Sequence, residues 1–223
     1  MIKLSLLIVI CMMTLACSTT PHNHPAVLSP FGDGNQWIVW QDMNFSAQQE
    51  GEVVANIRVP RGFVTDLAST PRRFWALYPP FGKYLSAAIL HDYLYWTQIC
   101  DRDMSDNIFY QTMKSSGVDP ATQAIFLMVL KSQGELAWQE NNLEKQKGLV
   151  RVIPDEFLNP DDDFITRNTD WHELRVKLHS LDVQDESTPD HKEMLRACIA
   201  LSGDAPVEPP KPKPSMTFLG LPL

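Results

Sequence analysis

The sequence predicts an α+β fold in which an N-terminal β-hairpin is followed by a mainly helical body. Residues 35–45 and 50–60 carry β-branched and aromatic side chains in rough alternation, a pattern typical of strands. From residue 83 onward the apolar residues recur at helical spacing, and two helices form an antiparallel pair that carries a His-Asp motif. The 223 residues are 44% hydrophobic and 21% charged, so the chain can form a sizeable core.

The first elements are the hairpin and a short helix. A six-residue loop, residues 46–51, is expected to join the two strands. A helix is then predicted to begin at Ser69 or Thr70, with a proline in its first turn, and to stop before Pro79.

Three further helices follow in the predicted core. Residues 83–99 form an apolar helix, and the next helix has Asp103 as its N-cap and Gly117 as its terminator. The third begins at Asp119 with a proline after it. Its residues 124–130 are apolar all round, which predicts that it is the central core helix.

The composition changes after about residue 150, which divides the rest of the chain from a core domain of residues 36–150. Residues 151–203 form an acidic helical extension in which 170–181 and 188–201 are two amphipathic helices. Residues 204–223 form a Pro-rich, extended tail.

The N-terminus indicates export and a lipid anchor. Residues 1–16 have the apolar run of a secretory signal peptide, too short to be a comfortable membrane span. The following Cys17 completes a segment, "MTLAC", that resembles the signal box of bacterial lipoproteins, in which the cysteine carries the lipid. This resemblance implies a polar tether over residues 17–35 and a periplasm-facing position, and Ser18 after the cysteine favours the outer membrane. An ordinary secreted protein or a retained membrane anchor is the alternative.

The net charge and the cysteine content limit which partners the chain can bind and which cellular compartment suits it. The net charge of −8 and the pI of about 5.2 argue against a nucleic-acid-binding protein, which usually has a basic domain. Besides Cys17 and the signal-peptide cysteine, the chain has Cys100 and Cys198. In an oxidising compartment these two can form a disulfide, or they can remain two buried thiols.

The segment "AAILHDYLYW" places an imidazole and a carboxylate in an apolar helix. His91 and Tyr95 share one helix face, and Asp106 on the next helix can face His91 across the antiparallel pair. A carboxylate that holds one ring nitrogen leaves the other free to take a proton from water. Asp92 lies about 100° further round the helix, where it could hold a cation, and its hard oxygen ligands favour calcium.

The sequences "HDYLY" and "SDNIF" resemble the histidine–aspartate helix pair of phospholipase A2-like proteins. This resemblance covers about twenty residues. It implies that His91 is the water-activating base, Asp106 its orienting partner, Tyr95 a hydrogen-bonding tyrosine and Asp92 a calcium ligand. The glycine-rich calcium loop of that superfamily is not evident, since Gly62 is the one glycine of "VPRGFVTDLAS".

A second resemblance covers roughly residues 36–140. The segments "VPRGFVTDLASTPRRFW", "AAILHDYLYW", "SDNIF" and "GELAW" are similar to a small family of uncharacterised proteins from phages, prophages and bacteria. The resemblance supplies no activity. It implies one shared site or one shared structural core formed by Asp66, Ser69, His91, Asp92 and Asp106.

A basic stretch precedes the histidine helix. Between Arg58 and Lys83 there are five basic side chains and one acidic side chain, Asp66. Basic groups beside a His-Asp site suit an anionic substrate such as a phospholipid, which makes Asp66, Ser69 and Arg72 candidate substrate-binding residues. The arginines could instead pair with the acidic C-terminal region.

Two functions remain open on the sequence alone. The first is a membrane-tethered envelope lipoprotein with phospholipase A2-like hydrolase chemistry. The second is a non-catalytic phage or prophage envelope lipoprotein that binds a surface or periplasmic partner. In the second case His91 and Asp106 are a buried structural pair, Ser69 is a helix cap, and Asp66 braces a turn.

Overall fold

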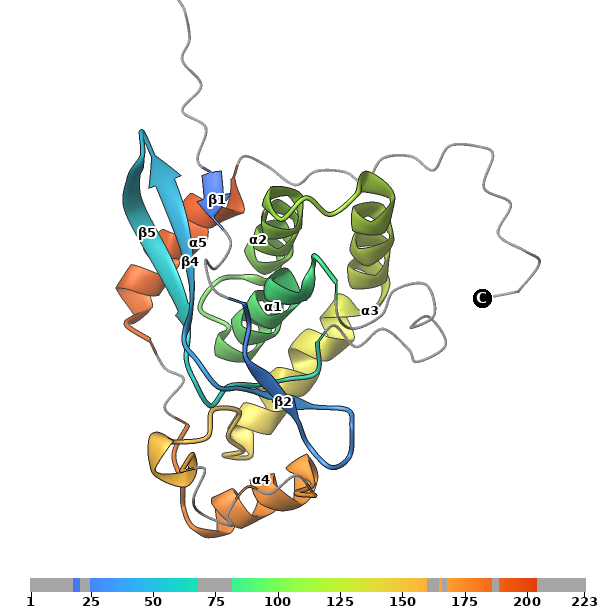
Figure 1. The fold of residues 1–223 in the computed structure, drawn as a ribbon, viewed down its shortest axis with the longest axis vertical. Helices are drawn as coiled ribbons and strands as arrows, with labels where there is room; N and C mark the ends of the chain where they lie inside the picture. Colours follow the sequence, from blue (N-terminus) through green and yellow to red (C-terminus); the bar gives the residue numbers. More distant parts are fainter. Residues whose placement is uncertain are drawn as a thin grey trace, which may run out of the picture.

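The computed structural model describes five parts of the chain, residues 25–67, 82–159, 165, 168–185 and 189–203, and the backbone of 18–20. The α+β class is confirmed, because antiparallel strands come first and α-helices follow (Figure 1). Some predictions lie outside the described residues, namely the signal peptide, Cys17, Ser69, Arg72, the helix expected after Ser69, and the Pro-rich tail.

The strands form two small antiparallel sheets of three strands each within the described residues. The first sheet has the order β1 (Ser18–Thr20), β4 (Met43–Gln49), β5 (Glu52–Val59). The second has the order β2 (Leu28–Pro30), β3 (Trp37–Val39), β6 (Val64–Thr65). Both β1 and β2 lie in the segment that the sequence predicts as a tether, so part of that segment is paired into the sheets.

The hairpin is present as β4 and β5, with two differences from the prediction. The first strand, expected over residues 35–45, is divided between β3 of the second sheet and β4 of the first, and the loop is shorter than the six residues expected. Gln49 pairs with Glu52, so Glu50 and Gly51 alone make the turn, with φ angles of 53° and 87°. Two successive positive φ angles are typical of the two-residue turns that match strand twist. The prediction of a longer loop was wrong because the polar residues before the turn continue β4, where Ala47 is fully buried.

Five α-helices follow the strands in the described residues: α1 (Leu85–Thr97), α2 (Arg102–Ser115), α3 (Pro120–Gln146), α4 (Trp171–Ser180) and α5 (His191–Ser202), with a short 3₁₀ helix η2 (Asp155–Phe157) before α4. Asp119 caps α3 as predicted. The cap of α2 is Asp101 and the prediction of Asp103 was wrong, because Asp101 has extended backbone angles and accepts the amide of Met104 at 2.7 Å.

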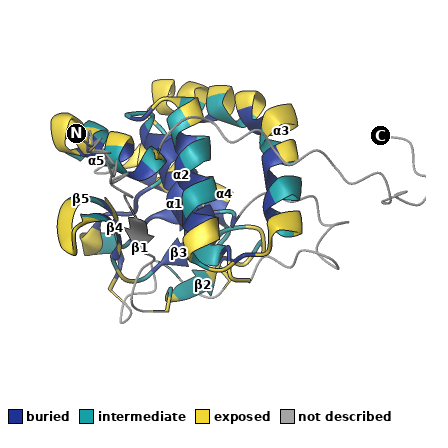
Figure 2. Ribbon diagram, turned by 90° about the horizontal axis from the view of Figure 1, so that it is seen from above, coloured by how far each residue is buried: buried dark blue, intermediate teal, exposed yellow. Residues whose placement is uncertain are grey.

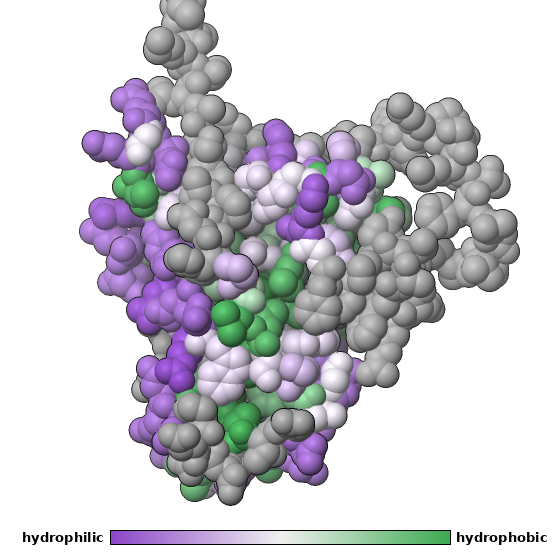
Figure 3. Space-filling view, viewed as in Figure 1, coloured by the Kyte–Doolittle hydropathy of each residue, from purple (hydrophilic) through white to green (hydrophobic). Residues whose placement is uncertain are grey.

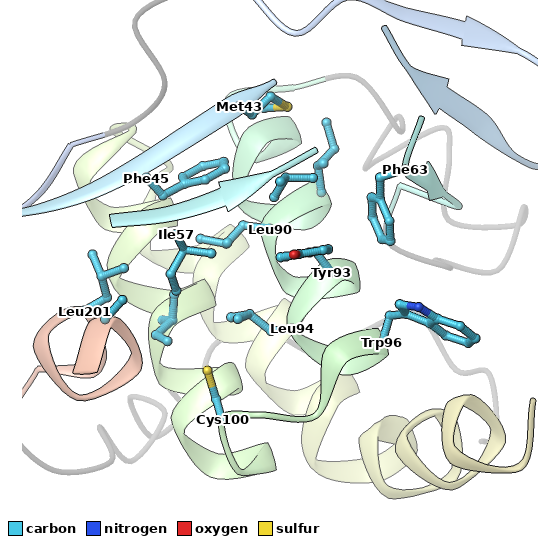
Figure 4. Close-up of a cluster of buried hydrophobic side chains, with 14 of the residues drawn as sticks. Met43, Phe45, Ile57, Phe63, Leu90, Tyr93, Leu94, Trp96, Cys100 and Leu201 are labelled. Carbon is cyan, nitrogen blue, oxygen red and sulfur yellow. The ribbon is translucent and has the colours of Figure 1, made fainter. Parts of the chain in front are cut away.

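Helix α1 is the central element of the core. From Ala87 to Thr97 every residue is buried except Asp92, which is partly buried, and Figure 2 shows this helix among the most buried parts of the chain. Leu90 and Leu94 lie below the hairpin strands, close to Phe45 and Ile57 (Figure 4). The alanines of α1 instead pack with apolar residues of α2 and α3, where their small volume lets these helices approach α1 closely.

The prediction that α3 is the central helix was wrong. Met128, Leu136 and Leu143 are 62%, 57% and 54% exposed, so α3 packs along one side of α1 and α2. An apolar run does not show which of its faces a neighbour covers, and here α1 already fills the centre. Although α3 is long, no helix in the described parts of the chain has the length and hydropathy to cross a membrane.

The C-terminal helices α4 and α5 pack against the two sheets. Helix α5 covers the first sheet and α2, and Met194, Ala197 and Leu201 join the core around α1. Cys198 on this helix and Cys100, just after α1, form a disulfide with a Cα–Cα distance of 5.8 Å. Helix α4 instead covers the second sheet, where Leu174 and Leu178 pack with Ile38. The acidic extension therefore contributes to the core.

Removing the disulfide should destabilise the chain. The bond closes a loop with a sequence separation of 98 residues, so we expect the double variant Cys100→Ala, Cys198→Ala to lose roughly 2–5 kcal/mol of unfolding free energy. Urea unfolding under oxidising and reducing conditions measures this loss of unfolding free energy. Reductant should shift the unfolding of the wild type and leave the double variant unchanged, and an equal response of both would contradict the expectation.

Candidate functional site

His91 lies in the middle of α1 and contacts α2. Its Nε2 is 2.9 Å from Oδ1 of Asp106, and its ring centroid is 4.9 Å from that of Phe109. Because an ionised carboxylate can only accept, Nε2 carries the proton of this bond and Nδ1 is the basic nitrogen. Nδ1 makes no hydrogen bond with any described residue. His91 is 7% exposed, so the imidazole is held in a largely dry environment.

Asp106 is held by two further donors. The hydroxyl of Tyr95 donates to Oδ1 at 2.7 Å, and Nη1 of Arg102 donates to Oδ2 at 3.3 Å. Burial and the charge of Asp106 raise the pKa of Tyr95, so its hydroxyl remains a neutral donor. Burial opposes the charge of Arg102, but Asp106, Tyr95 and Asp103 together outweigh burial and raise the pKa of the guanidinium. We call His91, Tyr95, Arg102 and Asp106 the His91 cluster.

The His91 cluster consists of two pairs of residues, and the members of each pair are four positions apart on one helix. Tyr95 follows His91 by one turn of α1, and Asp106 follows Arg102 by one turn of α2, so each pair shares a helix face. The left-handed conformation of Gln98, with φ of 56°, ends α1 and lets the short connection turn α2 back beside it. The antiparallel arrangement then brings the two pairs together, and the predicted contact of His91 with Asp106 is present.

Two charged residues of this site were missed by the sequence predictions. Arg102 also forms an ion pair with Glu135 of α3, with 3.3 Å between Nε and Oε2. The spacing of Arg102 and Asp106 at i and i+4 was a signal that could have identified the arginine. No such signal exists for Glu135, because its contact depends on how α3 packs against α2.

Asp92 belongs to a different network on another side of α1. Its Oδ2 accepts the hydroxyl of Thr65, and its carboxyl is hydrogen-bonded to Asp66. Burial and the neighbouring charge of Asp66 raise the pKa of Asp92, whereas the cation of Arg151 acts in the opposite direction. Two carboxyl groups in hydrogen-bond contact share a proton. We call Thr65, Asp66, Asp92 and Arg151 the Asp92 cluster.

Arg151 is fixed by contacts that the sequence did not predict. Its guanidinium donates to the carbonyl of Val64 and to Asn141 at 3.0 and 2.7 Å, and lies about 6 Å from the ring centroids of Phe63 and Trp96. A polar pocket of about 240 Å³ opens beside it. This pocket is lined by Asp33, Gln36, Asp66, Glu144, Arg151, Trp171, His172 and Arg175.

The single site implied by the second resemblance is therefore divided between two clusters. His91, Tyr95 and Asp106 are brought together, whereas Asp66 and Asp92 meet elsewhere. Ser69 and Arg72 lie outside the described residues. The reason is the helix itself, since two successive residues point about 100° apart and here contact different neighbours.

The described residues around Asp92 do not form a calcium site. Its carboxyl has the hydroxyl of Thr65 and the cation of Arg151 as partners. The carbonyl of Gly62, the glycine nearest to a calcium loop in sequence, accepts the amide of Ile153 at 3.0 Å. Calcium needs six to eight oxygen ligands, and among the described residues no group of three or more His, Cys, Asp or Glu side chains is gathered for a metal ion.

The described arginines of the basic stretch pair with carboxylates. Arg58 forms an ion pair with Asp42 at 2.9 Å, and Arg61 forms one with Asp155 of η2 at 3.5 Å and donates to a carbonyl at 2.8 Å. The pairing of Arg61 follows the alternative interpretation, in which these arginines bind the acidic C-terminal region. The described arginines therefore do not form an anion site beside His91.

Comparison with known proteins finds a similarity over the central part of the chain. Residues 37–130 match the family described as "Protein of unknown function (DUF1353)". No curated protein and no solved structure matches the chain. The matched residues include His91, Asp92 and Asp106 and end before Glu135 and Arg151. The chain is thus similar to an uncharacterised domain family that contains both helices of the His91 cluster.

Replacing Asp92 with asparagine tests the shared proton. The raised pKa of Asp92 means that the folded state favours its protonated form. This contribution to stability is present at low pH and is lost as pH rises through the folded pKa. Asparagine accepts the Thr65 hydroxyl without ionising. We therefore expect the unfolding free energy of Asp92→Asn, relative to wild type, to increase from about pH 4 to about pH 8.

Urea unfolding of both proteins across this pH range measures the difference. Asp182→Asn is a matched control, because Asp182 is an exposed residue just after α4. A difference between Asp92→Asn and wild type that stays constant or decreases with pH would contradict the shared proton.

Proposed function

We propose that the chain is a lipid-anchored envelope protein with a His-Asp hydrolase site that acts on phospholipid esters. The observation that carries this proposal is the 2.9 Å bond between Nε2 of His91 and Asp106, which leaves Nδ1 as the basic nitrogen. A base held in one tautomer by a carboxylate is the arrangement that general-base hydrolysis requires. The resemblance of this helix pair to phospholipase A2-like proteins supports the same chemistry.

The residues of the His91 cluster can carry one complete proton cycle. Nδ1 takes a proton from water while the water oxygen bonds to the ester carbonyl carbon. Asp106 stabilises the resulting imidazolium, and Tyr95 and Arg102 hold the carboxylate in position. The carbon–oxygen bond of the ester then breaks, and the imidazolium returns its proton to the leaving alkoxide, giving an alcohol and a carboxylic acid.

The surroundings of His91 support an apolar ester as the substrate class. Phe109 contacts the imidazole and belongs to an apolar cluster with Ala88 and Phe126 between α1, α2 and α3. In Figure 3, hydrophobic side chains gather near the middle of the face shown, in the region of α1 in Figure 1. The lipid anchor predicted at Cys17 would place this site at a membrane surface, where phospholipids are available.

One observation favours the non-catalytic alternative, in which the chain binds an envelope partner. Asp92 is bonded to Thr65 and Asp66 on another side of α1, so the phospholipase-like pairing of histidine and calcium ligand is not repeated here. In that case the His91 cluster is a buried structural network. Its removal would lower stability without affecting any turnover.

Replacing His91 separates the two functions. We expect His91→Ala to reduce fatty-acid release from vesicles of phosphatidylethanolamine and phosphatidylglycerol on the order of 10²–10⁴-fold, the usual contribution of a general base. The assay is run with calcium and with a chelator. His191→Ala is the control, because His191 is exposed at the start of α5. If wild type releases no fatty acid in either condition, the hydrolase proposal is wrong.

Lipid attachment at Cys17 is tested independently. Metabolic labelling with palmitate should mark the wild type, and Cys17→Ser should lose the label and move to the soluble periplasmic fraction. Cys11→Ser is the matched control, since its cysteine lies within the predicted signal peptide and should not affect the label. Retention of the label in Cys17→Ser, or its absence from wild type, would contradict the anchor.

A further inference from the structure

The sequence motif "GELAW", residues 134–138, lies on α3 and contacts the His91 cluster. A Cβ atom added to Gly134 would be 2.8 Å from the Tyr95 hydroxyl oxygen and 3.4 Å from Nη1 of Arg102. Glu135 pairs with Arg102 at 3.3 Å. The ring of Trp138 meets the ring of Tyr95 edge-on, with centroids 5.1 Å apart and an angle of 88°.

The residues of this motif contact Tyr95 and Arg102, which hold Asp106 together with His91. Tyr95 donates to one carboxylate oxygen and Arg102 to the other. A carboxylate bonded at both oxygens has little freedom to rotate, so its direction toward Nε2 of His91 depends on where Tyr95 and Arg102 lie. Small displacements of such groups reduce catalysis strongly, because reacting groups must be aligned within fractions of an ångström.

We propose that the 134–138 segment of α3 is a positioning clamp for the His91–Asp106 pair. Gly134 gives the space in which Tyr95 and Arg102 approach α3, Glu135 fixes the guanidinium, and Trp138 fixes the phenol ring. None of these residues touches the reacting atoms. The catalytic meaning of the clamp rests on the proposed hydrolase function, but its effect on the His91–Asp106 bond does not.

The bond can be observed without a substrate. In the chain labelled with ¹⁵N-histidine, the ring N–H of His91 that is bonded to Asp106 should give a slowly exchanging downfield NMR signal. The signal is assigned to His91 by its absence from the spectrum of His91→Gln. We expect Trp138→Ala and Glu135→Gln to broaden or shift this signal. Leu136→Ala, within the same motif but 57% exposed, should leave it unchanged.

A cycle of substitutions at positions 134 and 95 tests the role of the glycine. Gly134→Ala should lower the melting temperature, because the new methyl group meets the Tyr95 hydroxyl. In the background of Tyr95→Phe that hydroxyl is absent, and the same change should raise the melting temperature, as alanine favours a helix over glycine. A Gly134→Ala effect of the same sign in both backgrounds would overturn the proposal.

Turnover then distinguishes failure of the clamp from failure of the function. If wild type hydrolyses the vesicles, Trp138→Ala should lower kcat on the order of 10-fold or more with little change in KM, and Trp138→Phe should restore most of it. If wild type shows no turnover but the NMR signal responds as expected, the hydrolase proposal fails and the clamp stands. An NMR signal that is unchanged in Trp138→Ala and Glu135→Gln refutes the clamp.

Discussion

Helix α1 is buried almost all round and yet carries a histidine and an aspartate in succession, and the rest of the structure depends on satisfying these two groups. A buried polar side chain without a partner is strongly destabilising. His91 and Asp92 point in different directions, so no single neighbour can serve both. The chain therefore supplies Asp106 from α2 for His91, and Thr65, Asp66 and Arg151 for Asp92.

The partners of α1 come from distant parts of the sequence, which ties the acidic C-terminal segment to the core. Trp96 donates to Asp185 at 2.7 Å, and Asp185 also accepts the backbone amide of Arg151 at 3.1 Å. Lys145 of α3 donates to the carbonyl of Thr97 at the end of the helix. With the Cys100–Cys198 bond, these contacts hold α5 and the described residues around Arg151 and Asp185 against the helix that carries the candidate site.

The two clusters differ in the chemistry that their surroundings permit. In the His91 cluster one carboxylate accepts from three donors, which fixes its direction toward Nε2 of His91 and leaves Nδ1 as the basic nitrogen. In the Asp92 cluster two carboxyls lie together beside one arginine, which favours a shared proton. The dipeptide His91-Asp92 therefore does not act as one catalytic unit, and the hydrolase proposal depends on the His91 cluster alone.

The sequence by itself determined the α+β class, the His91–Tyr95–Asp106 contact and most of the helices after residue 82, because these follow from spacing within one helix or between adjacent helices. It did not determine that α1 rather than α3 is central, that Cys100 and Cys198 are bonded, or that Asp92 is hydrogen-bonded to Thr65 and Asp66. Only the tertiary structure decided these, because each depends on which face of an element a distant segment covers. Hydrophobic periodicity records that a face is buried, but it carries no information about the identity of the neighbour.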